Sequence, residues 1–207
     1  MDLNKWYNDT VILPQDWQMR NIDQLNSIQQ PNEIVIHHVG SGETPNLPIL
    51  DNISEEEAVK NIEHHHIRNL NFLAFGYQYA VMLKNIFAAR PINRVGAHVR
   101  GQNTGKIGIL VYGNFNYEEP TQNQKLMITN LVNFLKQIKP FTVTTHGRLA
   151  NTMCPGKHLQ EFVDEMNEAN WSQSNLKKQK VNKNAMIERI KSATSTLQEL
   201  SDLIKRL

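Results

Sequence analysis

The chain has 207 residues, of which 40% are hydrophobic and 20% charged, and its formal net charge is +2. This composition fits one globular domain with an appendage, and it excludes collagen, general disorder and a coiled coil along the whole chain. The charge is mild and no basic stripe lies among aromatic residues, which argues against nucleic acid as a partner. A single cysteine cannot form an intramolecular disulfide.

The first residues lack the basic and apolar stretches of a signal peptide, and no apolar run of about 18 residues occurs. We therefore expect no secretion signal and no membrane span, and we expect synthesis in the cytoplasm.

Charge and composition change near residue 172. Residues 172–207 carry eight Lys or Arg against three Asp or Glu, a net charge of +5, which leaves −3 for residues 1–171. We predict a domain over 1–171 whose first 29 residues form an extension packed on it. A polar linker over 172–184 and a helix over 185–207 are predicted to follow.

The predicted helix over 185–207 has an apolar stripe from Met186 to Leu207 with alternating steps of three and four residues. Such a helix needs a partner. It either packs back on its own domain or forms a homo-oligomer, and docking on a membrane surface or cell wall is a further alternative.

In the main domain, short apolar runs alternate with amphipathic stretches. Ser54 and Glu57 fit a capping box at the start of the first amphipathic stretch. The pattern predicts helices over 54–70, 121–138 and 156–169, and strands over 33–38, 77–83, 85–90, 106–113 and 141–146. Strands separated by helices predict an α/β fold, a central mixed sheet flanked by helices.

Two histidines end predicted strands, and the cysteine follows the second. His37 precedes a Gly-containing turn, His146 closes the last strand, and Cys154 lies eight residues further, before Pro155 and Gly156. Two imidazoles and a thiolate can hold zinc and leave a fourth position for water. On spacing alone, Cys154 is equally compatible with a small buried hydrophobic residue.

Four segments in chain order carry a resemblance: IVIHHVGSG, FGYQYAVML, RVGAHVRGQNTGKIGILVYGNF and THGRLANTMCPG. Together, over residues 30–165, they resemble the zinc-dependent N-acetylmuramoyl-L-alanine amidases. These are the type 2 amidases, which share a fold with phage lysins and animal peptidoglycan recognition proteins. The resemblance implies an amidase-like α/β fold with an extra C-terminal amphipathic helix.

The resemblance also implies a function. It predicts a zinc cofactor and hydrolysis of the amide between N-acetylmuramic acid and L-alanine in bacterial peptidoglycan. With no signal, a bacteriolytic phage or prophage endolysin fits best, made in the host cytoplasm and acting at the cell wall after release, or carried on a virion. The alternatives are a non-catalytic peptidoglycan-binding module and a metal-free thiol hydrolase.

Residue roles follow from the same resemblance. It implies zinc ligands at His37, His146 and Cys154, with Tyr77 as the catalytic tyrosine beside the metal. Thr152 falls where the family has a Lys or Thr that helps to hold the polarised carbonyl.

Four further residues are implied in the substrate groove: His98, Asn103, Arg90 and Asn114. His98 and Asn103 have a structural alternative, since they could instead stabilise a Gly-rich turn.

The other histidines favour structural roles. His38 follows a ligand on the opposite strand face and is expected to be packed or hydrogen-bonded. His64, His65 and His66 fan out by about 100° each on a helix and cannot converge on one ion. Most of this run is expected at the surface. His66 matches a helix histidine of the family, and the resemblance implies that it supports the ligands or has a structural role and does not bind the metal.

The sequence departs from the family in two turns. Residues 89–92, AlaArgProIle, replace a Gly-Arg-Gly-Trp-like turn, which removes an aromatic residue. HisGlyArg at 146–148 replaces a HisArgAsp-like run, next to a predicted ligand.

Overall fold

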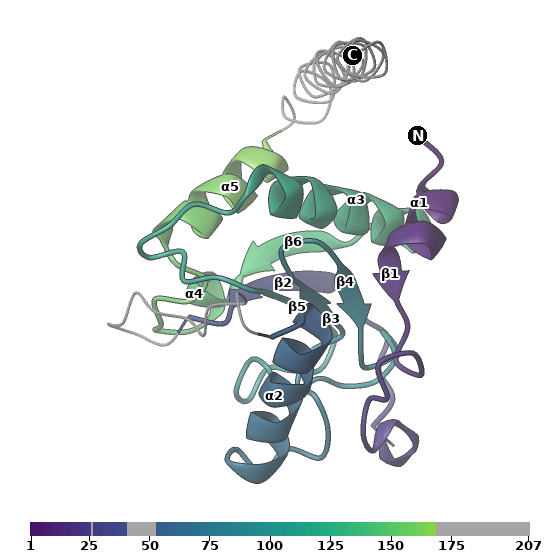
Figure 1. Ribbon diagram of the computed structural model, residues 1–207. Helices are drawn as coiled ribbons and strands as arrows, with labels where there is room; N and C mark the ends of the chain where they lie inside the picture. Colours follow the sequence, from purple (N-terminus) through teal and green to yellow (C-terminus); the bar gives the residue numbers. More distant parts are fainter. Residues whose placement is uncertain (26, 41–52, 169–207) are drawn as a thin grey trace, which may run out of the picture. The chain divides into compact units, whose positions relative to one another are not determined.

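A computed structural model describes residues 1–25, 27–40 and 53–168 (Figure 1). A compact unit spans Met1–Asp164. The predicted linker over 172–184 and helix over 185–207 lie outside the described residues and stay predictions. None of the described helices has the length and apolar character needed to cross a membrane.

A six-stranded sheet forms the centre of this unit, with the order β1-β4-β3-β5-β2-β6. β3 and β4 form an antiparallel pair, and the other neighbours run parallel. The sheet is therefore mixed, as predicted. Its strands are β1 (Val11–Ile12), β2 (Glu33–His38), β3 (Tyr79–Val81), β4 (Ile86–Ala88), β5 (Lys106–Val111) and β6 (Thr142–Thr145).

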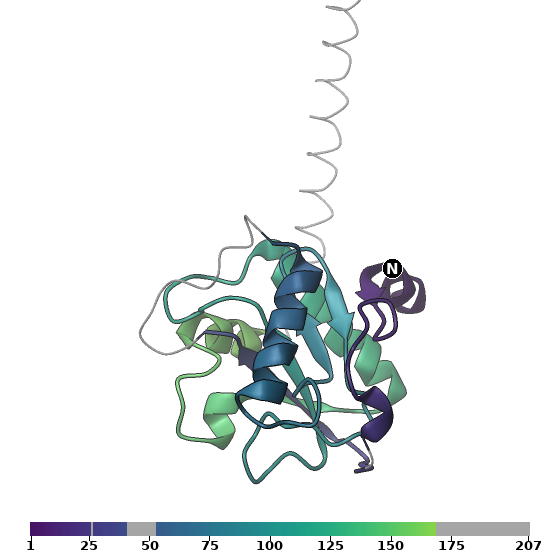
Figure 2. The ribbon, with the colours of Figure 1, turned by 60° about the horizontal axis from the view of Figure 1, so that its bottom comes forward.

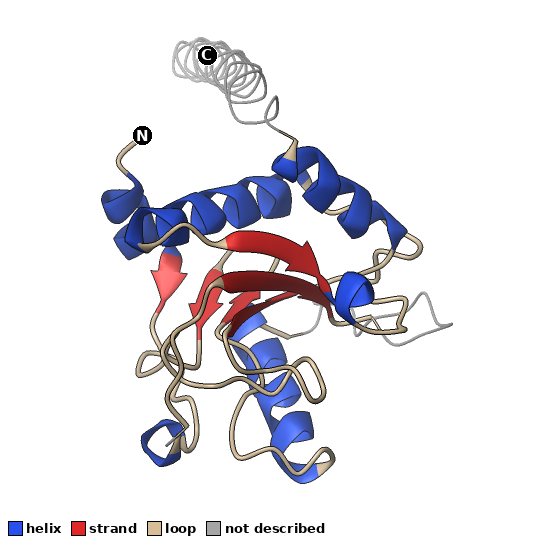
Figure 3. Cartoon of the chain, turned by 180° about the vertical axis from the view of Figure 1, so that it is seen from behind, coloured by secondary structure: helices blue, strands red, loops and turns tan. Residues whose placement is uncertain are grey.

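Helices cover both faces of the sheet (Figures 1 and 3). α2 (Glu55–Arg68) lies on one face, and α3 (Gln122–Ile138) and α5 (Lys157–Asn167) lie on the other. His37 pairs in register with Leu110, which packs in a cluster with Ala58 and Val59 of α2. Because paired residues point to the same face of a sheet, His37 faces the α2 side.

Two predicted strands are shorter than expected at the residues that matter for the site. Tyr77 and Gln78 precede β3, so Tyr77 lies in the connection that enters the strand. β6 ends at Thr145, and His146 begins the short helix α4 (His146–Leu149).

α2 lies against the sheet (Figure 2) and is tied to its surroundings through Ser54, Glu55 and Glu63. Ser54 caps the helix by accepting a hydrogen bond from the Glu57 backbone N–H at 3.1 Å, which is the serine half of the predicted capping box. Glu55 accepts from the backbone of the β3–β4 turn, with 2.7 Å to the Lys84 nitrogen. Glu63 accepts from the Arg20 nitrogen at 2.8 Å. These contacts fix the position of α2 beside the sheet.

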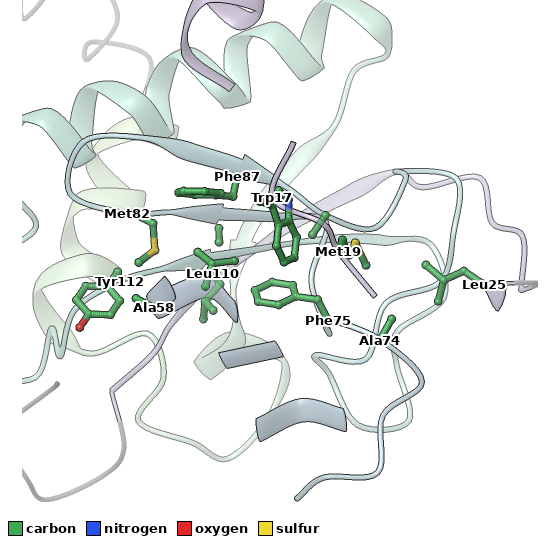
Figure 4. Packing of buried hydrophobic residues seen from close by; sticks show 13 residues of the cluster. Trp17, Met19, Leu25, Ala58, Ala74, Phe75, Met82, Phe87, Leu110 and Tyr112 are labelled. Atoms are coloured by element: carbon green, nitrogen blue, oxygen red, sulfur yellow. The ribbon is translucent and has the colours of Figure 1, made fainter. Parts of the chain in front are cut away.

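The N-terminal extension packs at the edge of the sheet formed by β1 and β4. It begins with α1 (Leu3–Thr10) and adds β1 beside β4; a 3₁₀ turn, η1 (Ile22–Gln24), follows. Tyr7 stacks on Phe134 of α3 with ring centroids 4.1 Å apart. Trp17 is fully buried, and its indole N–H donates to the Ala88 carbonyl at 2.7 Å. Figure 4 shows Trp17 beside Phe75 and Phe87 in the core.

Candidate metal centre

Three candidate ligands meet at the carboxyl ends of two neighbouring parallel strands. His37 lies near the end of β2, and His146 directly follows β6, which pairs with β2. The loop after α4 brings Cys154 back to β2, where the His38 backbone N–H donates to its Sγ at 3.4 Å. One ligand atom from each of the three residues lies within 4.8 Å of the others.

The spacing and chemistry of these atoms fit zinc. Cys154 Sγ lies 3.8 Å from His37 Nδ1, and the rings of His37 and His146 are 4.6 Å apart at their centroids. Ligands at zinc–sulfur and zinc–nitrogen bond lengths, arranged tetrahedrally, stand about 3.5 Å apart. The donor set is therefore one that could hold zinc with a fourth position open.

Burial sets the protonation of the three groups. It lowers the pKa of His37 well below its ordinary value, with smaller contributions from His98, His146 and His38, and it lowers the pKa of His146. Both imidazoles are thus neutral near pH 7, the form that binds metal. Burial raises the pKa of the Cys154 thiol to about 12, so that the thiol keeps its proton unless a cation displaces it.

Tyr77 lies beside the first ligand. Its ring centroid is 5.1 Å from that of His37, and the rings of His66 and His98 each lie 5.7 Å from it. Burial, and secondarily Cys154, raise the pKa of Tyr77, so its hydroxyl stays protonated and can donate a hydrogen bond.

Thr152 is exposed on the loop that carries Cys154. Its hydroxyl oxygen accepts from the Cys154 backbone N–H at 3.2 Å, which ties the loop together. The hydroxyl can still donate outward, toward a ligand beside the cysteine.

The predicted groove residues His98 and Asn103 lie in the connection between β4 and β5. His98 is 8% exposed, and its Nδ1 lies 3.0 Å from His37 Nε2. Asn103 Oδ1 accepts from the backbone nitrogens of His98 and Val99, both at 2.7 Å. These contacts place His98 against the candidate ligand His37, and Asn103 against the backbone of the turn that carries His98.

Arg90 and Asn114, also predicted in the groove, are buried in loop contacts. Arg90 donates to the carbonyls of Phe75, Ala74 and Val95, and burial lowers its pKa to about 10. The Asn114 backbone N–H donates to Glu118 at 2.8 Å.

Two other histidines accept hydrogen bonds from backbone N–H groups. His38 Nδ1 accepts from the Phe115 N–H at 3.3 Å, and His66 Nδ1 accepts from the Gly76 N–H at 3.2 Å. Burial lowers the pKa of each to about 4. Both are therefore neutral structural acceptors at pH 7.

Two cavities adjoin the centre. One of about 400 Å³ lies between α2 and the ends of β2 and β5, and its largely apolar lining includes Ala58, Ile62, Leu110 and Tyr77. The other, of about 330 Å³, lies at the Cys154 loop and is lined in part by Arg148, Thr152, Met153 and Lys157. Tyr77 thus lines the first cavity and lies beside His37, the first candidate ligand.

A mixed sheet covered by helices on both faces, with two histidines and a cysteine converging at its strand ends, defines an amidase-like α/β domain. Residues 27–157, more than half of the chain, match the family described as N-acetylmuramoyl-L-alanine amidase. The chain belongs to this family.

Relatives of two kinds share the fold. An endolysin amidase of Clostridium intestinale aligns at 26% identity and a TM-score of 0.54, over 69% of this chain and 90% of that one. The peptidoglycan-recognition protein SC2 of Drosophila simulans is 27% identical over 106 residues, which is 49% of this chain and 58% of the relative. The structure of peptidoglycan recognition protein-LE with tracheal cytotoxin aligns at 23% identity and a TM-score of 0.64, over 75% and 93%.

Sequence reasoning did not find two supporting contacts of the centre. One is the backbone N–H of His38 on Cys154, and the other is the ring of His98 on His37. A signal for the second is Gly108 in the middle of a buried strand, because an interior strand glycine often marks a close approach by another group.

Proposed function

We propose that this chain is a zinc-dependent amidase that hydrolyses the bond between N-acetylmuramic acid and L-alanine in bacterial peptidoglycan, and that it acts as a phage or prophage lysin. The observation that carries the proposal is the convergence of His37, His146 and Cys154 beside Tyr77 in a member of this family. The likeness to a clostridial endolysin supports the lytic role.

His37 Nδ1, His146 and Cys154 Sγ would hold the metal. Zinc in such a site supplies a bound water with a pKa near about 7 and polarises a carbonyl oxygen. Tyr77 stays protonated and donates to the oxygen on which negative charge develops during attack on the amide. Thr152 stands on the Cys154 side and offers a second hydroxyl donor.

We assign the substrate to the cavity between α2 and the strand ends. This cavity reaches Tyr77, and its apolar lining suits the methyl groups of the lactyl and alanyl units on either side of the scissile bond. Recognition protein-LE, whose structure contains tracheal cytotoxin, a monomeric diaminopimelic acid-type peptidoglycan, supports a peptidoglycan ligand.

Binding of peptidoglycan without catalysis is the second candidate, favoured by matched relatives that are named recognition proteins. A chain that only binds has no need of a partly buried thiol whose sulfur lies within 4.8 Å of the nitrogens of two neutral imidazoles. A metal-free thiol hydrolase is disfavoured, because burial raises the pKa of Cys154 to about 12 and leaves little thiolate at pH 7.

The deciding experiment measures zinc content and muropeptide release on the same purified full-length sample. Wild-type protein is compared with C154S and with wild-type protein treated with a chelator. We expect about one zinc per chain, and new L-alanyl amino termini that disappear in both controls.

Two other outcomes would favour the alternative functions. Zinc binding with no release from several wall types would favour the binding module. Release that survives the chelator would contradict the metal mechanism and favour the thiol.

A further inference from the structure

His98 is fixed by its surroundings more tightly than a groove residue needs to be. Its ring stacks on Tyr77 and meets His37 edge-on, with centroids 5.7 and 5.0 Å away. Two glycines make room for it: a Cβ at Gly96 would lie 2.5 Å, and one at Gly108 2.6 Å, from His98 Cδ2. The ring therefore occupies a slot that larger residues at these positions would close.

The contact with His37 involves a different ring nitrogen from the one that lies near Cys154. His37 Nδ1 faces Cys154 Sγ at 3.8 Å, whereas His37 Nε2 lies 3.0 Å from His98 Nδ1. A nitrogen that binds metal carries no proton, so a ligating, neutral His37 holds its proton on Nε2. This N–H must then donate to His98 Nδ1.

The second ring nitrogen of His98, Nε2, shows the cost of this arrangement. With Nδ1 accepting, a neutral His98 holds its own proton on Nε2. This nitrogen is buried and has no hydrogen-bond partner among the described residues. Buried polar groups without partners are rare and disfavoured in folded proteins, so an unpartnered one next to a ligand calls for a functional explanation.

We propose that His98 is a positioning residue of the metal centre: its Nδ1 accepts the Nε2–H of His37 and thereby holds His37 in the tautomer and orientation that present Nδ1 to the metal. The inference rests on the proposed metal site and revises the sequence-based placement of His98 in the substrate groove. Partners of this kind orient ligating histidines, and their loss lowers metal affinity by about 10- to 100-fold.

The test compares the zinc dissociation constants of full-length wild type, H98L and H98N by competition with a chromophoric chelator. H98L removes the acceptor, and we expect its zinc affinity to fall by about 10- to 100-fold. In H98N the amide oxygen stands where Nδ1 stood, so this variant should retain most of the affinity. The visible spectrum of the cobalt-substituted protein should change in H98L and be preserved in H98N.

Two further variants separate this role from general loss of structure. H66L alters another buried histidine that packs on Tyr77 but does not hydrogen-bond to His37, and its zinc affinity should match that of the wild type. G108A retains the His98 side chain but forces its ring to shift, so it should weaken zinc binding in the same direction as H98L. Circular dichroism of the metal-free proteins reports whether each variant is folded.

Unchanged zinc affinity in a folded H98L, or equal losses in H98L and H98N, would overturn the proposal. So would weaker binding of a soluble muropeptide with zinc affinity preserved, since that result would return His98 to the groove. Wild-type protein that binds zinc but releases no muropeptide would overturn the proposed catalysis alone, and the zinc measurements would still decide the role of His98.

Discussion

At the carboxyl end of β2 the buried side chains are polar and are held by hydrogen bonds, with His37, His98 and His38 each in contact with a specific atom. Beside β4, in contrast, Trp17 packs edge-on against Phe75 and Phe87, with ring centroids 6.0 and 6.5 Å away. The named side chains of both regions are buried, but those near β2 are polar imidazoles and those near β4 are apolar rings.

The polar region therefore serves the chemistry of the site, and the apolar region serves the stability of the fold. Burial of His37 and His98 disfavours their charged forms and leaves neutral imidazoles, at a cost to the folded state. Burial of the aromatic cluster stabilises the fold by about 25 cal/mol per Å² of apolar surface. Substitutions in the first region should therefore alter the reaction or the metal, and those in the second should alter unfolding.

The largest effect on stability is expected for W17A. The substitution leaves a cavity beside two aromatic rings and leaves the Ala88 carbonyl without its indole donor, and it should lower the free energy of unfolding by about 3–5 kcal/mol. Urea denaturation measures the change. Zinc affinity measured below the unfolding transition should be unaltered, and a marked loss would show that the two regions are coupled.

Y77F tests the polar region, where a substitution should change activity and not stability. Removing the hydroxyl takes away a donor to the developing charge, and the rate of muropeptide release at saturating zinc should fall by about 10²- to 10³-fold. Zinc content and the unfolding midpoint should stay near the wild-type values. Full activity in Y77F would assign Tyr77 to packing alone.

The pH dependence of stability should show the cost of a buried histidine. The pKa of His66 is about 4 in the folded chain against an ordinary value of 6.5. Between these values the unfolded chain binds the extra proton, so stability falls as the pH falls through this window. Unfolding of wild-type and H66N protein at pH 7 and pH 5, with chelator present, measures it. The wild type should lose about 2 kcal/mol more than the variant, and equal losses would contradict a neutral, buried His66.

The smallest effect is expected for Y7F. The Tyr7 hydroxyl lies 3.2 Å from the Tyr79 hydroxyl, and the ring stacks on Phe134. Loss of one hydrogen bond with the ring retained should cost about 0.5–1.5 kcal/mol in urea denaturation and leave activity unchanged. A loss comparable to that of W17A would mean that α1 is attached mainly through this bond.

Periodic patterns predicted much of this architecture. The strand over 33–38, the capped helix after Ser54 and the helix after Thr121 carry strong local signals, and each is present. The predicted cluster of His37, His146 and Cys154 also comes together, because adjacent parallel strands end at the same edge of the sheet.

The remaining features depend on contacts that local patterns do not encode. β1 has two residues, too few for any periodicity, and its partner β4 lies far along the chain. The run FTVTTH continues a strand pattern through His146, yet tertiary packing starts a helix there. Likewise, the path of the β4–β5 connection decides whether His98 meets substrate or His37.

Trp17 also shows that the limits of the family match are not the limits of the folding unit. The match begins at residue 27, so a fragment cut at that point would lack Trp17, Met19 and Leu25, all of which contribute to the core. It would also lack β1, leaving β4 as an exposed sheet edge next to uncovered aromatic rings. Such a fragment would keep the three candidate ligands but be prone to aggregation, and its inactivity would say little about the centre itself.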